Sequence, residues 1–467
     1  MKSIVNIAIV FMAIFLLSAC ATYYQKQTQF QNKFAFGHIE EAKKYLENNA
    51  KQAEKKDRLL YFLDRGVVEH MLGNFQESNY YFEEAYLFTQ DYRKNFSGDF
   101  VEMVANPMLR PYRGEDFEVV LIHFYKALNF IQLDELDDAL IEIRRVNIKL
   151  NELNDKYEDK KNRYKQDAFA QNLMGMIYEA KGNYNDAFIA YRNAYETYSN
   201  SYNEDFQVNC PDQLKKDLIR MAAFNGFRQE LEQYQDTFNL KYERTDHTGG
   251  ELVFFWLNGL GPVKGEFSLN LSTLQGEGGM FTFANEAEGF SIPYNAAANN
   301  QSAADFGDLN FIRLAVPKYN SREPLASSAK LYIDSTIKSD LQLAENINSI
   351  AKSTLQDRLA RELAKSIGRL AIKQATQAAV RKENEELGSL VSIINAVTEK
   401  ADTRNWQSLP HSIYYQKLPL DTGFHQLKLI VNNSNQSNDT INFEVNIQKG
   451  KTHFMSFHSL GSSMPQP

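Results

Sequence analysis

The sequence predicts an α+β multidomain protein, in which an irregular α-solenoid of helical repeats precedes a β-sandwich-like domain with a helical-hairpin insertion. The residue pattern changes near residue 245, from helical periodicity rich in Tyr, Phe, Glu, Lys and Ala to short β-rich runs with Gly and Asn. Related helix-turn-helix segments recur before that point. The 467 residues are 43% hydrophobic, which is enough for more than one core.

Four segments are expected from these changes of pattern. Residues 1–19 form a signal peptide and residues 20–244 form the helical repeats. The β-rich domain takes residues 245–338 and 399–467, and residues 339–398 form the helical insertion between its two parts.

The first segment has the order of a secretory signal. Lys2 precedes an apolar stretch from Ile4 to Leu17, which is too short for a stable membrane span. The residues Leu17-Ser18-Ala19-Cys20 resemble a bacterial lipobox, and this resemblance implies that Cys20 is the lipidated first residue of the mature chain. A plain secretory signal with a chance cysteine is the less favoured alternative, because four positions match together.

The residue after the cysteine bears on the location. In lipoproteins of this kind an Asp there favours retention in the inner membrane, whereas this chain has Ala21. We therefore expect a lipid-anchored protein of the outer membrane, facing the periplasm. No other segment reaches the ~18 continuous apolar residues of a second span.

Composition and motifs argue against several function classes. The formal net charge of -8 gives no basic footprint for nucleic acid. Cys210 has no disulfide partner once Cys20 is acylated. The eight histidines include no pair at helical metal-binding spacing, and "GLGPVKG" lacks the Gly-Lys-Ser/Thr ending of a phosphate loop, so it is expected to be a turn. We expect no enzyme, no metal site and no cofactor.

The repeated segments identify the type of helical repeat. "GNYNDAFIAYRNAY" after "QNLMGMIYEAK" places small and aromatic residues at the offsets of a tetratricopeptide repeat, and it resembles that family. Similar offsets occur in "DRGVVEHMLGNFQESNYYFEEAY" and "YKALNFIQLDELDDALIEIRRV". "FGHIEEAKKYLEN" resembles the second helix of the first repeat, and "NGFRQELEQYQDTF" is expected to close the array.

The resemblance implies a concave groove lined by the first helix of each repeat. Its positions, called the groove residues below, are Leu63, Val67, His70, Phe124, Leu128, Ile131, Phe169, Asn172, Met176 and Glu179. They are mostly apolar, and the Lys/Asn/Arg clamp for a terminal carboxylate is absent. Either a hydrophobic partner segment fills the groove or another part of this chain does, and we favour filling by the chain itself.

Beyond residue 245, alternation of apolar and polar residues predicts strands. They are expected at residues 251–258, 310–319, 329–335, 412–418, 425–432, 440–448 and 452–460. The alternation is clearest in the last three, which predicts an antiparallel meander within a sandwich.

The insertion contains an apolar stripe at helical spacing, made of Leu355, Leu359, Leu363, Ile367 and Leu370. Residues 352–382 carry eight Lys or Arg against two Asp or Glu. This basic helix could contact anionic lipid. We favour the simpler interpretation that its stripe packs on a partner helix, "LGSLVSIINAVTEK".

Several longer motifs occur together. "PYRGEDFEVVLIHFYKALNF", "GELVFFWLNGLGPVKGEF", "ADTRNWQSLPHSIYYQKLPLDTGFHQLKL" and the lipobox together resemble an uncharacterised family of bacterial envelope lipoproteins with tetratricopeptide-like repeats and a β-rich C-terminal half. The family has no assigned chemistry, so the resemblance implies a location more than an activity. Asp402 and Arg404 are expected to pair beside Trp406 and to organise the return of the chain into the sheet. An exposed ligand surface at these three residues is the alternative.

These expectations favour a protein-interaction scaffold or adaptor, anchored in the outer membrane, that docks an envelope protein through its repeats. Two alternatives remain open. One is a regulator of cell-wall synthesis or of an export machine. The other is a glycan-binding or lipid-binding module, which requires an open pocket lined by the aromatic residues of the β half.

Overall fold

The structure is a computed structural model. It describes residues 23–95, 108, 110–155, 162–243, 248–285, 290–295, 311–383, 400–433 and 438–465. Cys20 and the signal segment therefore lie outside the described residues. So does most of the expected second helix of the insertion. Among the described residues, no helix has the length and apolar character needed to cross a membrane.

The N-terminal half consists mainly of helical hairpins. The five pairs are α3 (Thr28–Ala35) with α4 (Ile39–Asn48), α5 (Arg58–Met71) with α6 (Phe75–Asn95), α8 (Asp116–Gln132) with α9 (Leu136–Asn154), α10 (Ala168–Ala180) with α11 (Tyr184–Thr197), and α13 (Asp212–Asn225) with α14 (Arg228–Phe238). A short helix, α2 (Tyr23–Lys26), precedes this array, and another, α12 (Asn203–Phe206), lies between its fourth and fifth pairs.

One turn geometry recurs between the helices of each pair. The residue two positions before the second helix has a left-handed backbone, with φ of 78° at Gly73, 61° at Asp134 and 76° at Gly182. The next residue donates its N–H to a carbonyl five positions earlier, as from Asn74 to Glu69 at 2.9 Å. These are the bonds of a Schellman turn, which satisfies the last carbonyls of the first helix. The same geometry occurs at Gly37 and Gly226.

Small residues set how closely the paired helices approach. An ideal Cβ on Gly175 of α10 would lie 2.4 Å from the Tyr191 ring of α11. One on Gly66 of α5 would lie 2.6 Å from the Phe82 ring of α6. This is the packing for which the repeat pattern requires glycine, so the predicted helical repeats of the N-terminal half are confirmed.

The C-terminal half contains two four-stranded sheets that face each other. The first has the order β12-β1-β9-β8, made of β12 (Thr452–Ser459), β1 (Gly250–Asn258), β9 (Ser412–Leu420) and β8 (Gln342–Asn346). The second has the order β11-β10-β6-β7, made of β11 (Asp439–Ile447), β10 (Gly423–Asn433), β6 (Ala326–Ile333) and β7 (Ile337–Asp340). Their facing sides enclose one of the hydrophobic cores.

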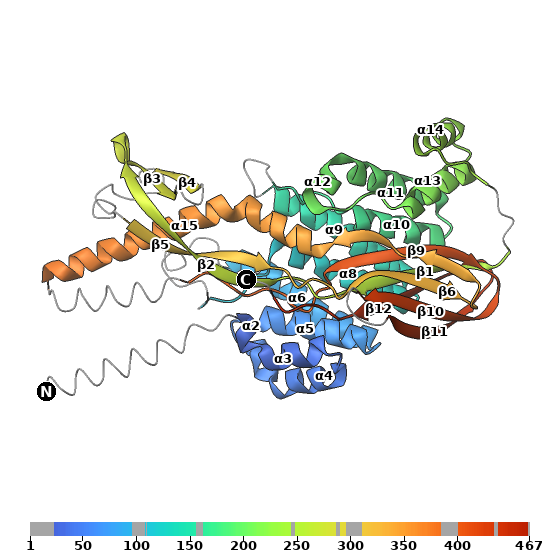
Figure 1. The fold of residues 1–467 in the computed structure, drawn as a ribbon, viewed down its shortest axis with the longest axis horizontal. Coiled ribbons are helices and arrows are strands. Elements are labelled where there is room, and N and C mark those ends of the chain that lie inside the picture. Colours follow the sequence, from blue (N-terminus) through green and yellow to red (C-terminus); the bar gives the residue numbers. More distant parts are fainter. Residues whose placement is uncertain are drawn as a thin grey trace.

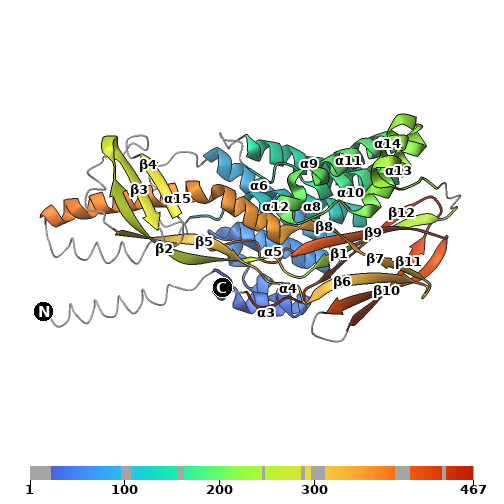
Figure 2. The ribbon, with the colours of Figure 1, turned by 45° about the horizontal axis from the view of Figure 1, so that its top comes forward.

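Strand β1 is buried on both faces because it lies between two cores. Its alternate residues Leu252, Phe254 and Trp256 belong to the core between the two sheets. The intervening residues Val253, Phe255 and Leu257 belong to the core that the first sheet shares with the helical repeats. Figures 1 and 2 both show the later helices of the repeats, α9 to α14, on one side of the first sheet and the second sheet on the other.

The predicted meander of the last three strands is wrong. β10 and β11 are antiparallel neighbours, but β12 joins the other sheet and pairs in parallel with β1. Glu251 of β1 is opposite Thr452 of β12, 201 residues later in the chain. Local alternation marks a strand and does not indicate which distant strand will pair with it.

A third sheet has the order β4-β3-β2-β5, and the residue pattern predicted only one of its strands. It contains β2 (Val263–Gln275), β3 (Met280–Asn285), β4 (Phe290–Asn295) and β5 (Phe311–Asn320), of which only β5 was predicted. The long helix α15 (Ile347–Glu383) packs along this sheet and extends with it toward one end of the molecule (Figure 1).

The predicted insertion needs two corrections. Its first residues, expected to begin the insertion at 339, instead form the end of β7 and all of β8, and the helix starts only at Ile347. Its apolar stripe does not need a partner helix, because Leu359, Leu363 and Ile367 pack against the third sheet. Leu355 belongs to the core shared with the repeats.

Candidate functional site

The expected groove of the repeats is filled by the first sheet. All ten groove residues are buried, with exposed fractions between 0% and 8%. The ring of Phe169 on α10 lies 6.0 Å from that of Phe255 on β1 and 6.1 Å from that of Tyr415 on β9. These residues therefore do not form an open docking surface for a partner, because the C-terminal half of the same chain occupies the space.

Buried charges also join the repeats to this sheet. Lys417 of β9 donates to Glu179 of α10 at 2.5 Å and lies 3.2 Å from Glu251 of β1. Arg220 of α13 contacts the same two carboxylates at 2.6 and 2.5 Å. Burial alone would raise the pKa of Glu251, but the two cations outweigh it and lower that pKa to about 2. The cluster fixes the sheet on the repeats.

A pocket of about 240 Å³ lies where three of the long motifs meet. It is lined by residues 110–115 before α8, by Lys264 of β2, by one face of α15, by part of β5 and by residues 401, 402 and 404. These segments belong to the "PYRGED", "GLGPVKG" and "ADTRNW" motifs together with the basic helix. We call this cavity the motif pocket.

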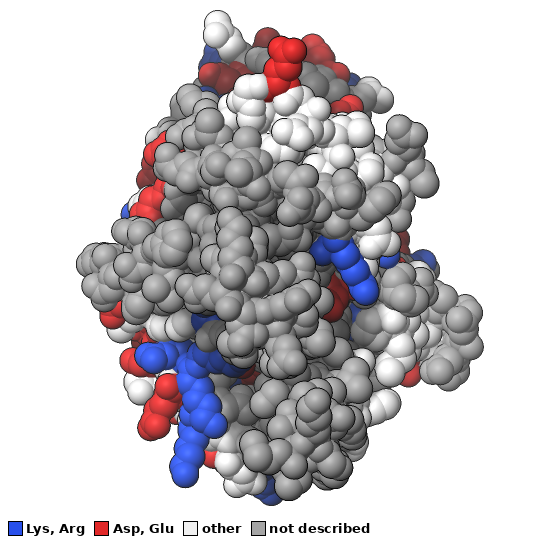
Figure 3. All heavy atoms as spheres, turned by 90° about the vertical axis from the view of Figure 1, so that its left-hand side faces the viewer, with Lys and Arg blue, Asp and Glu red and all other residues white. Residues whose placement is uncertain are grey.

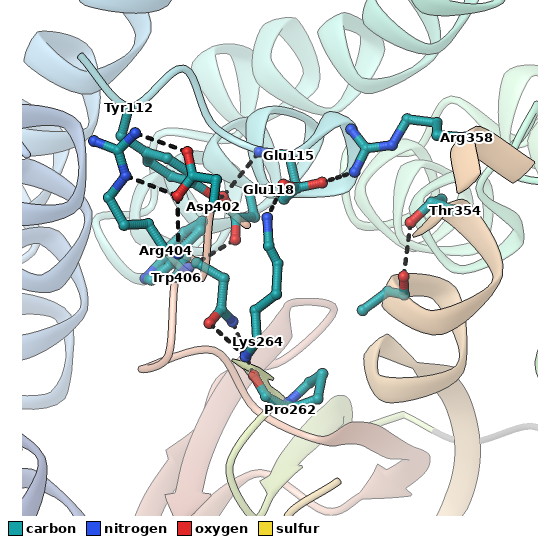
Figure 4. A network of polar contacts seen from close by, with 12 residues as sticks. Tyr112, Glu115, Glu118, Pro262, Lys264, Thr354, Arg358, Asp402, Arg404 and Trp406 are labelled. Carbon is teal, nitrogen blue, oxygen red and sulfur yellow. Dashed lines mark hydrogen bonds and ion pairs between the residues drawn. The ribbon is translucent and has the colours of Figure 1, made fainter. Parts of the chain in front are cut away.

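Glu115 organises the charged wall of the motif pocket (Figure 4). Its carboxylate forms ion pairs with Lys264 of β2 and with Arg358 of α15. Burial would raise the pKa of Glu115, but these two cations dominate and lower it to about 2. Three elements that are distant in the sequence are thus held together by one ionised carboxylate.

Glu115 also begins helix α8. Its side chain accepts from the backbone N–H three residues on, and Glu118 accepts from the N–H of Glu115 at 3.0 Å, which completes a capping box. Glu115 and Asp116 carry their charges at the start of α8, where acidic residues suit the helix dipole. The sequence did not indicate that Glu115 would bind two distant cations.

Glu118 lies deeper than Glu115 and is fully buried. It accepts from the Trp406 N–H at 2.7 Å and from the Tyr112 hydroxyl at 2.7 Å. Burial and the neighbouring charge of Glu115 raise the pKa of Glu118 to about 7. Its contacts link the residue-400 segment to α8.

The proposed ligand surface at residues 402, 404 and 406 is mostly buried. Arg404 is 1% exposed and pairs with Asp402 at 2.7 Å and Asp57 at 2.9 Å. Its guanidinium also donates to the carbonyl of Arg110 at 2.7 Å. Trp406 packs against the rings of Phe82 and Tyr125, at 5.8 and 5.6 Å. An exposed three-residue surface is therefore wrong, although Asp402 and Arg404 line the motif pocket.

Charge and shape distinguish the motif pocket from a simple packing gap. Its walls carry five cationic side chains, from Arg110, Arg113, Lys264, Arg358 and Arg404, and three carboxylates, from Glu115, Glu362 and Asp402. The remaining wall includes apolar residues such as Leu355, Leu363 and Val316. The lining therefore includes both charged and apolar residues, and Arg404 is also paired with Asp57, which lies outside the lining.

A second surface feature lies on the outer helices of the repeats. Tyr80, Ile141 and Ile189 are each the sixth residue of their helix, in α6, α9 and α11, and they are 56%, 46% and 39% exposed. Leu87 and Ile148 are each the thirteenth residue of α6 and α9, and they are also exposed. We call these five residues the outer ridge.

The outer ridge lies among acidic side chains. In the described parts of α6, α9 and α11, the exposed charged residues are the cation Arg144 and the acids Glu77, Asp91, Asp137, Asp138, Glu152, Asp186 and Glu196. Figure 2 shows these three helices along the side of the molecule away from the sheets. The five ridge residues therefore lie on helices whose other exposed charged residues are mostly acidic.

Comparisons with known proteins add little about function. No protein-family model and no curated protein matches the sequence. Among solved structures, MamA matches with 12% identity and a TM-score of 0.28, over 46% of this chain and 92% of that one. BtubC from P. vanneervenii matches with 13% identity and a TM-score of 0.32, over 48% and 84%. NprR, solved with its cognate peptide NprX, matches with 16% identity and a TM-score of 0.20, over 46% and 65%.

Similarities at these scores carry no argument about activity or partners. The features of this chain that bear on function are therefore the motif pocket, the filled groove and the outer ridge.

Proposed function

We propose that the protein is a lipid-anchored scaffold or adaptor of the outer membrane, which docks an envelope protein along the outer ridge. The observation that carries this proposal is the exposure of large apolar side chains at equivalent positions of three successive repeats. Single exposed apolar residues are common on soluble proteins, whereas a repeated line of them is typical of an interaction surface.

The position of the docking surface follows from the filled groove. Tetratricopeptide-like repeats usually present their first helices to a partner, but here the first sheet covers those helices. The second helices are left as the exposed face of the array, and the outer ridge runs along them.

The chemistry of the ridge specifies its partner. Apolar side chains favour an apolar stripe on the partner, and the surrounding carboxylates favour cationic residues at its edges. The expected occupant is a basic amphipathic helix or extended segment of another envelope protein. Such a segment differs from a peptide bound through its terminal carboxylate, which requires a clamp of cationic residues.

The anchor is proposed from the lipobox resemblance and supported by the start of the described chain. The backbone N–H of Tyr23 donates to the Thr403 hydroxyl at 3.1 Å, so the chain is held against the body three residues after Cys20. A diacylated or triacylated cysteine would therefore hold the folded body close to the membrane.

The alternatives use the same features differently. A regulator of cell-wall synthesis or of export would also bind its target on the outer ridge, and the identity of the partner separates it from a general adaptor. We propose no catalytic role, because two of the pocket carboxylates, Glu115 and Asp402, are already engaged in ion pairs.

Site-specific photocrosslinking in cells tests the ridge. A photoreactive residue at position 80, 141 or 189 is expected to link to the same envelope protein, through a peptide with net positive charge. The matched control is position 424, because Phe424 is 82% exposed but lies on the second sheet. Absence of adducts at the ridge, or equal adducts at position 424, would contradict the docking proposal.

Ridge variants give a second readout. Ile141→Glu and Ile189→Glu should abolish the crosslink from position 80 and leave the melting temperature nearly unchanged, because surface substitutions usually change stability by less than about 0.5 kcal/mol. A crosslink that survives both substitutions would show that the ridge is not the contact.

Membrane fractionation tests the anchor separately. The Cys20→Ser variant should lose outer-membrane association and accumulate with its signal peptide uncleaved, whereas Cys210→Ser should fractionate like the wild type. Unchanged fractionation of the Cys20→Ser variant would contradict lipid anchoring and leave the ridge proposal standing.

A further inference from the structure

A second pocket lies at the contact between the repeats and the first sheet. It has a volume of about 210 Å³ and lies between the turn that joins α5 to α6 and the end of β12. Its lining includes two histidines, His70 of α5 and His458 of β12, and one methionine, Met71. Both histidines are more than nine-tenths buried. We call this cavity the imidazole pocket.

The pairing of β12 with β1 turns His458 toward the repeats. His458 is opposite Leu257 of β1, and opposite residues of paired strands point to the same face of a sheet. Leu257 belongs to the core that the first sheet shares with the repeats. At the end of α8, the Gln132 side chain donates to the Phe454 carbonyl of β12 at 3.3 Å, which holds this strand against the helices.

The hydrogen bonds of His70 determine which of its ring nitrogens carries the proton. The side-chain amide of Asn129 donates to the Ser78 hydroxyl at 2.8 Å and to the Asn79 carbonyl oxygen at 2.9 Å. The remaining oxygen of Asn129 can only accept, and it lies 2.6 Å from Nδ1 of His70. Nδ1 is therefore the donor, and Nε2 of His70 keeps a lone pair.

The same reasoning applies to His458 with the two nitrogens exchanged. Its Nε2 lies 2.9 Å from the Gly259 carbonyl oxygen, which can only accept, so its Nδ1 keeps the lone pair. Neither lone-pair nitrogen has a hydrogen-bond partner among the described residues, and neither is a fully buried atom, so both are open to the pocket. Histidines that bind metals typically donate one ring N–H to a carbonyl in this way.

Both imidazoles are also in the protonation state that binds metals. Burial lowers the pKa of His70 and of His458, and it lowers the pKa of His458 to about 4. A charge on His70 would lower the pKa of His458 further, which shows that the two rings interact across the pocket. Neutral imidazole is the form that serves as a ligand.

The lining excludes other classes of ligand. Lys and Arg side chains are visible at the end of the molecule that carries α15 and the third sheet (Figure 3), whereas the described residues that line the imidazole pocket include no Lys or Arg to bind an anion. They also include no Asp or Glu, the residues that hard cations such as Ca²⁺ and Mg²⁺ prefer.

The third potential ligand is a thioether. Among the described residues, no three side chains of His, Cys, Asp or Glu gather where they could hold a metal ion. Met71 lines the same pocket as the two histidines, and its sulfur is a soft ligand. Zn²⁺ usually takes four ligands, whereas imidazole and thioether ligands together favour Cu⁺.

We infer that the imidazole pocket binds one Cu⁺ ion through Nε2 of His70, Nδ1 of His458 and the sulfur of Met71. This site does not depend on the proposed lipid anchor or on the outer ridge. It differs from the expectation that the histidines form no metal site, because that expectation considered only local spacing. The fold brings His458 to His70 from the other half of the chain.

Anaerobic competition for Cu⁺ between the purified protein in nonionic detergent and the chelator bicinchoninate tests this inference. The wild type should take up one Cu⁺ per chain. His70→Gln, His458→Gln and Met71→Leu should each weaken the affinity by about tenfold or more. Glutamine keeps an N–H that can donate to Asn129 or Gly259, and leucine keeps the apolar volume of methionine.

Two matched variants control for loss of a histidine or a methionine elsewhere. His453 is on the same strand as His458 but does not line the pocket, and Met464 is 76% exposed. His453→Gln and Met464→Leu should both bind Cu⁺ within about twofold of the wild type. X-ray absorption of the wild-type complex should show both nitrogen and sulfur neighbours of the copper.

Several results would overturn the inference. One is no uptake of Cu⁺ by the wild type, and another is a loss in the control variants as large as in the pocket variants. Unchanged affinity in Met71→Leu, or copper without a sulfur neighbour, would exclude the thioether ligand. Displacement of Cu⁺ by an equal concentration of Zn²⁺ would exclude the selectivity. Because Met71 is partly exposed, its variant keeps the test valid even if the histidine variants disturb folding.

Discussion

Lys417 of β9 and Glu179 of α10 form a buried ion pair at 2.5 Å, across the interface between the first sheet and the helical repeats. The two residues are 238 positions apart in the chain. Both are at least nine-tenths buried. Glu179 belongs to the groove expected from the repeat pattern. This contact therefore shows that the first sheet of the same chain occupies the groove.

Removing the cation of this pair should be strongly destabilising. In Lys417→Met, Glu179, Glu251 and Asp217 would be left with Arg220 alone, and loss of one member of a buried pair typically costs about 3–5 kcal/mol. Urea unfolding measures the change. Lys330→Met is the control, because that lysine pairs with Asp340 at 3.5 Å on an exposed edge.

The double variant Lys417→Met with Glu179→Gln should recover part of the loss, because it removes a carboxylate that would otherwise stay unpaired. A loss below about 1 kcal/mol in Lys417→Met would contradict a buried, fully paired cluster.

The close approach of α10 and α11 gives a second prediction. Gly175→Ala would add a Cβ 2.4 Å from the ring of Tyr191, whose hydroxyl is held by Glu179 at 2.8 Å. Alanine favours a helix over glycine by about 1 kcal/mol, but overpacking costs about 1–3 kcal/mol. We expect a net loss of roughly 1–2 kcal/mol in the free energy of unfolding.

Two variants check the cause of that loss. Gly461→Ala should be nearly neutral, because its nearest heavy atom would be 3.5 Å from the new Cβ. Adding Tyr191→Leu to Gly175→Ala should relieve the overlap, so the two losses should not be additive. Additive losses would show that the ring is not the obstacle.

The predicted helices were recognisable because the repeat pattern is local. Gly175, Tyr191 and the turn at Gly182 lie within one hairpin, and each has a steric reason for its position. The apolar groove residues left both a partner segment and the chain itself as possible occupants, and the long insertions between the repeats favoured the chain itself. The sequence could not identify the filling strands, because the partners of Phe169 on β1 and β9 are separated from it by 86 and 246 residues.

The motif pocket was harder to predict for a different reason. Lys264 was assigned to a turn because its motif lacks a phosphate-loop ending, and nothing in the sequence indicated an ion-pair partner for Glu115. Glu115 pairs with both Lys264 and Arg358, and this arrangement depends on the third sheet. The helix that carries Arg358 was expected to pack on another helix instead. The only sequence signal for the pocket was that "PYRGED", "GLGPVKG" and "ADTRNW" occur in one chain. Their occurrence together does not indicate how these segments are arranged in space.

Asp64 gives a prediction about pH. Burial raises the pKa of this carboxyl to about 7, even though the Ser408 hydroxyl donates to it at 2.7 Å. In the unfolded chain its pKa is about 4, so the folded state binds the proton more tightly and loses stability as pH rises from about 4 to 7.

Asp64→Asn should remove this pH dependence and keep the acceptor for Ser408. Relative to the wild type, the variant should gain stability between pH 5 and pH 8, by about 1.4 kcal/mol per unit of pKa shift titrated in that interval. Unfolding free energies of both proteins at the two pH values measure it. An equal pH dependence in both proteins would contradict the raised pKa.

Substitution of Arg404 tests whether its ion pairs stabilise the fold or whether it belongs to a ligand-binding surface. Arg404→Ala would leave Asp402 and Asp57 without their common cation and the Arg110 carbonyl without a donor. We expect a loss of about 3–5 kcal/mol. The matched variant Asp402→Ala should lose less, because the side chain of Asp402 is 27% exposed. Normal thermal stability of Arg404→Ala would favour the ligand surface instead.

The central claim is that the first sheet of this chain, and no partner, fills the groove of the repeats. A diazirine amino acid of about the size of methionine at position 176, activated in living cells, tests it most directly. Mass spectrometry should find crosslinks from position 176 only within the chain, to residues 250–258 of β1 or 412–420 of β9. A discrete adduct with another protein at that position would contradict the claim.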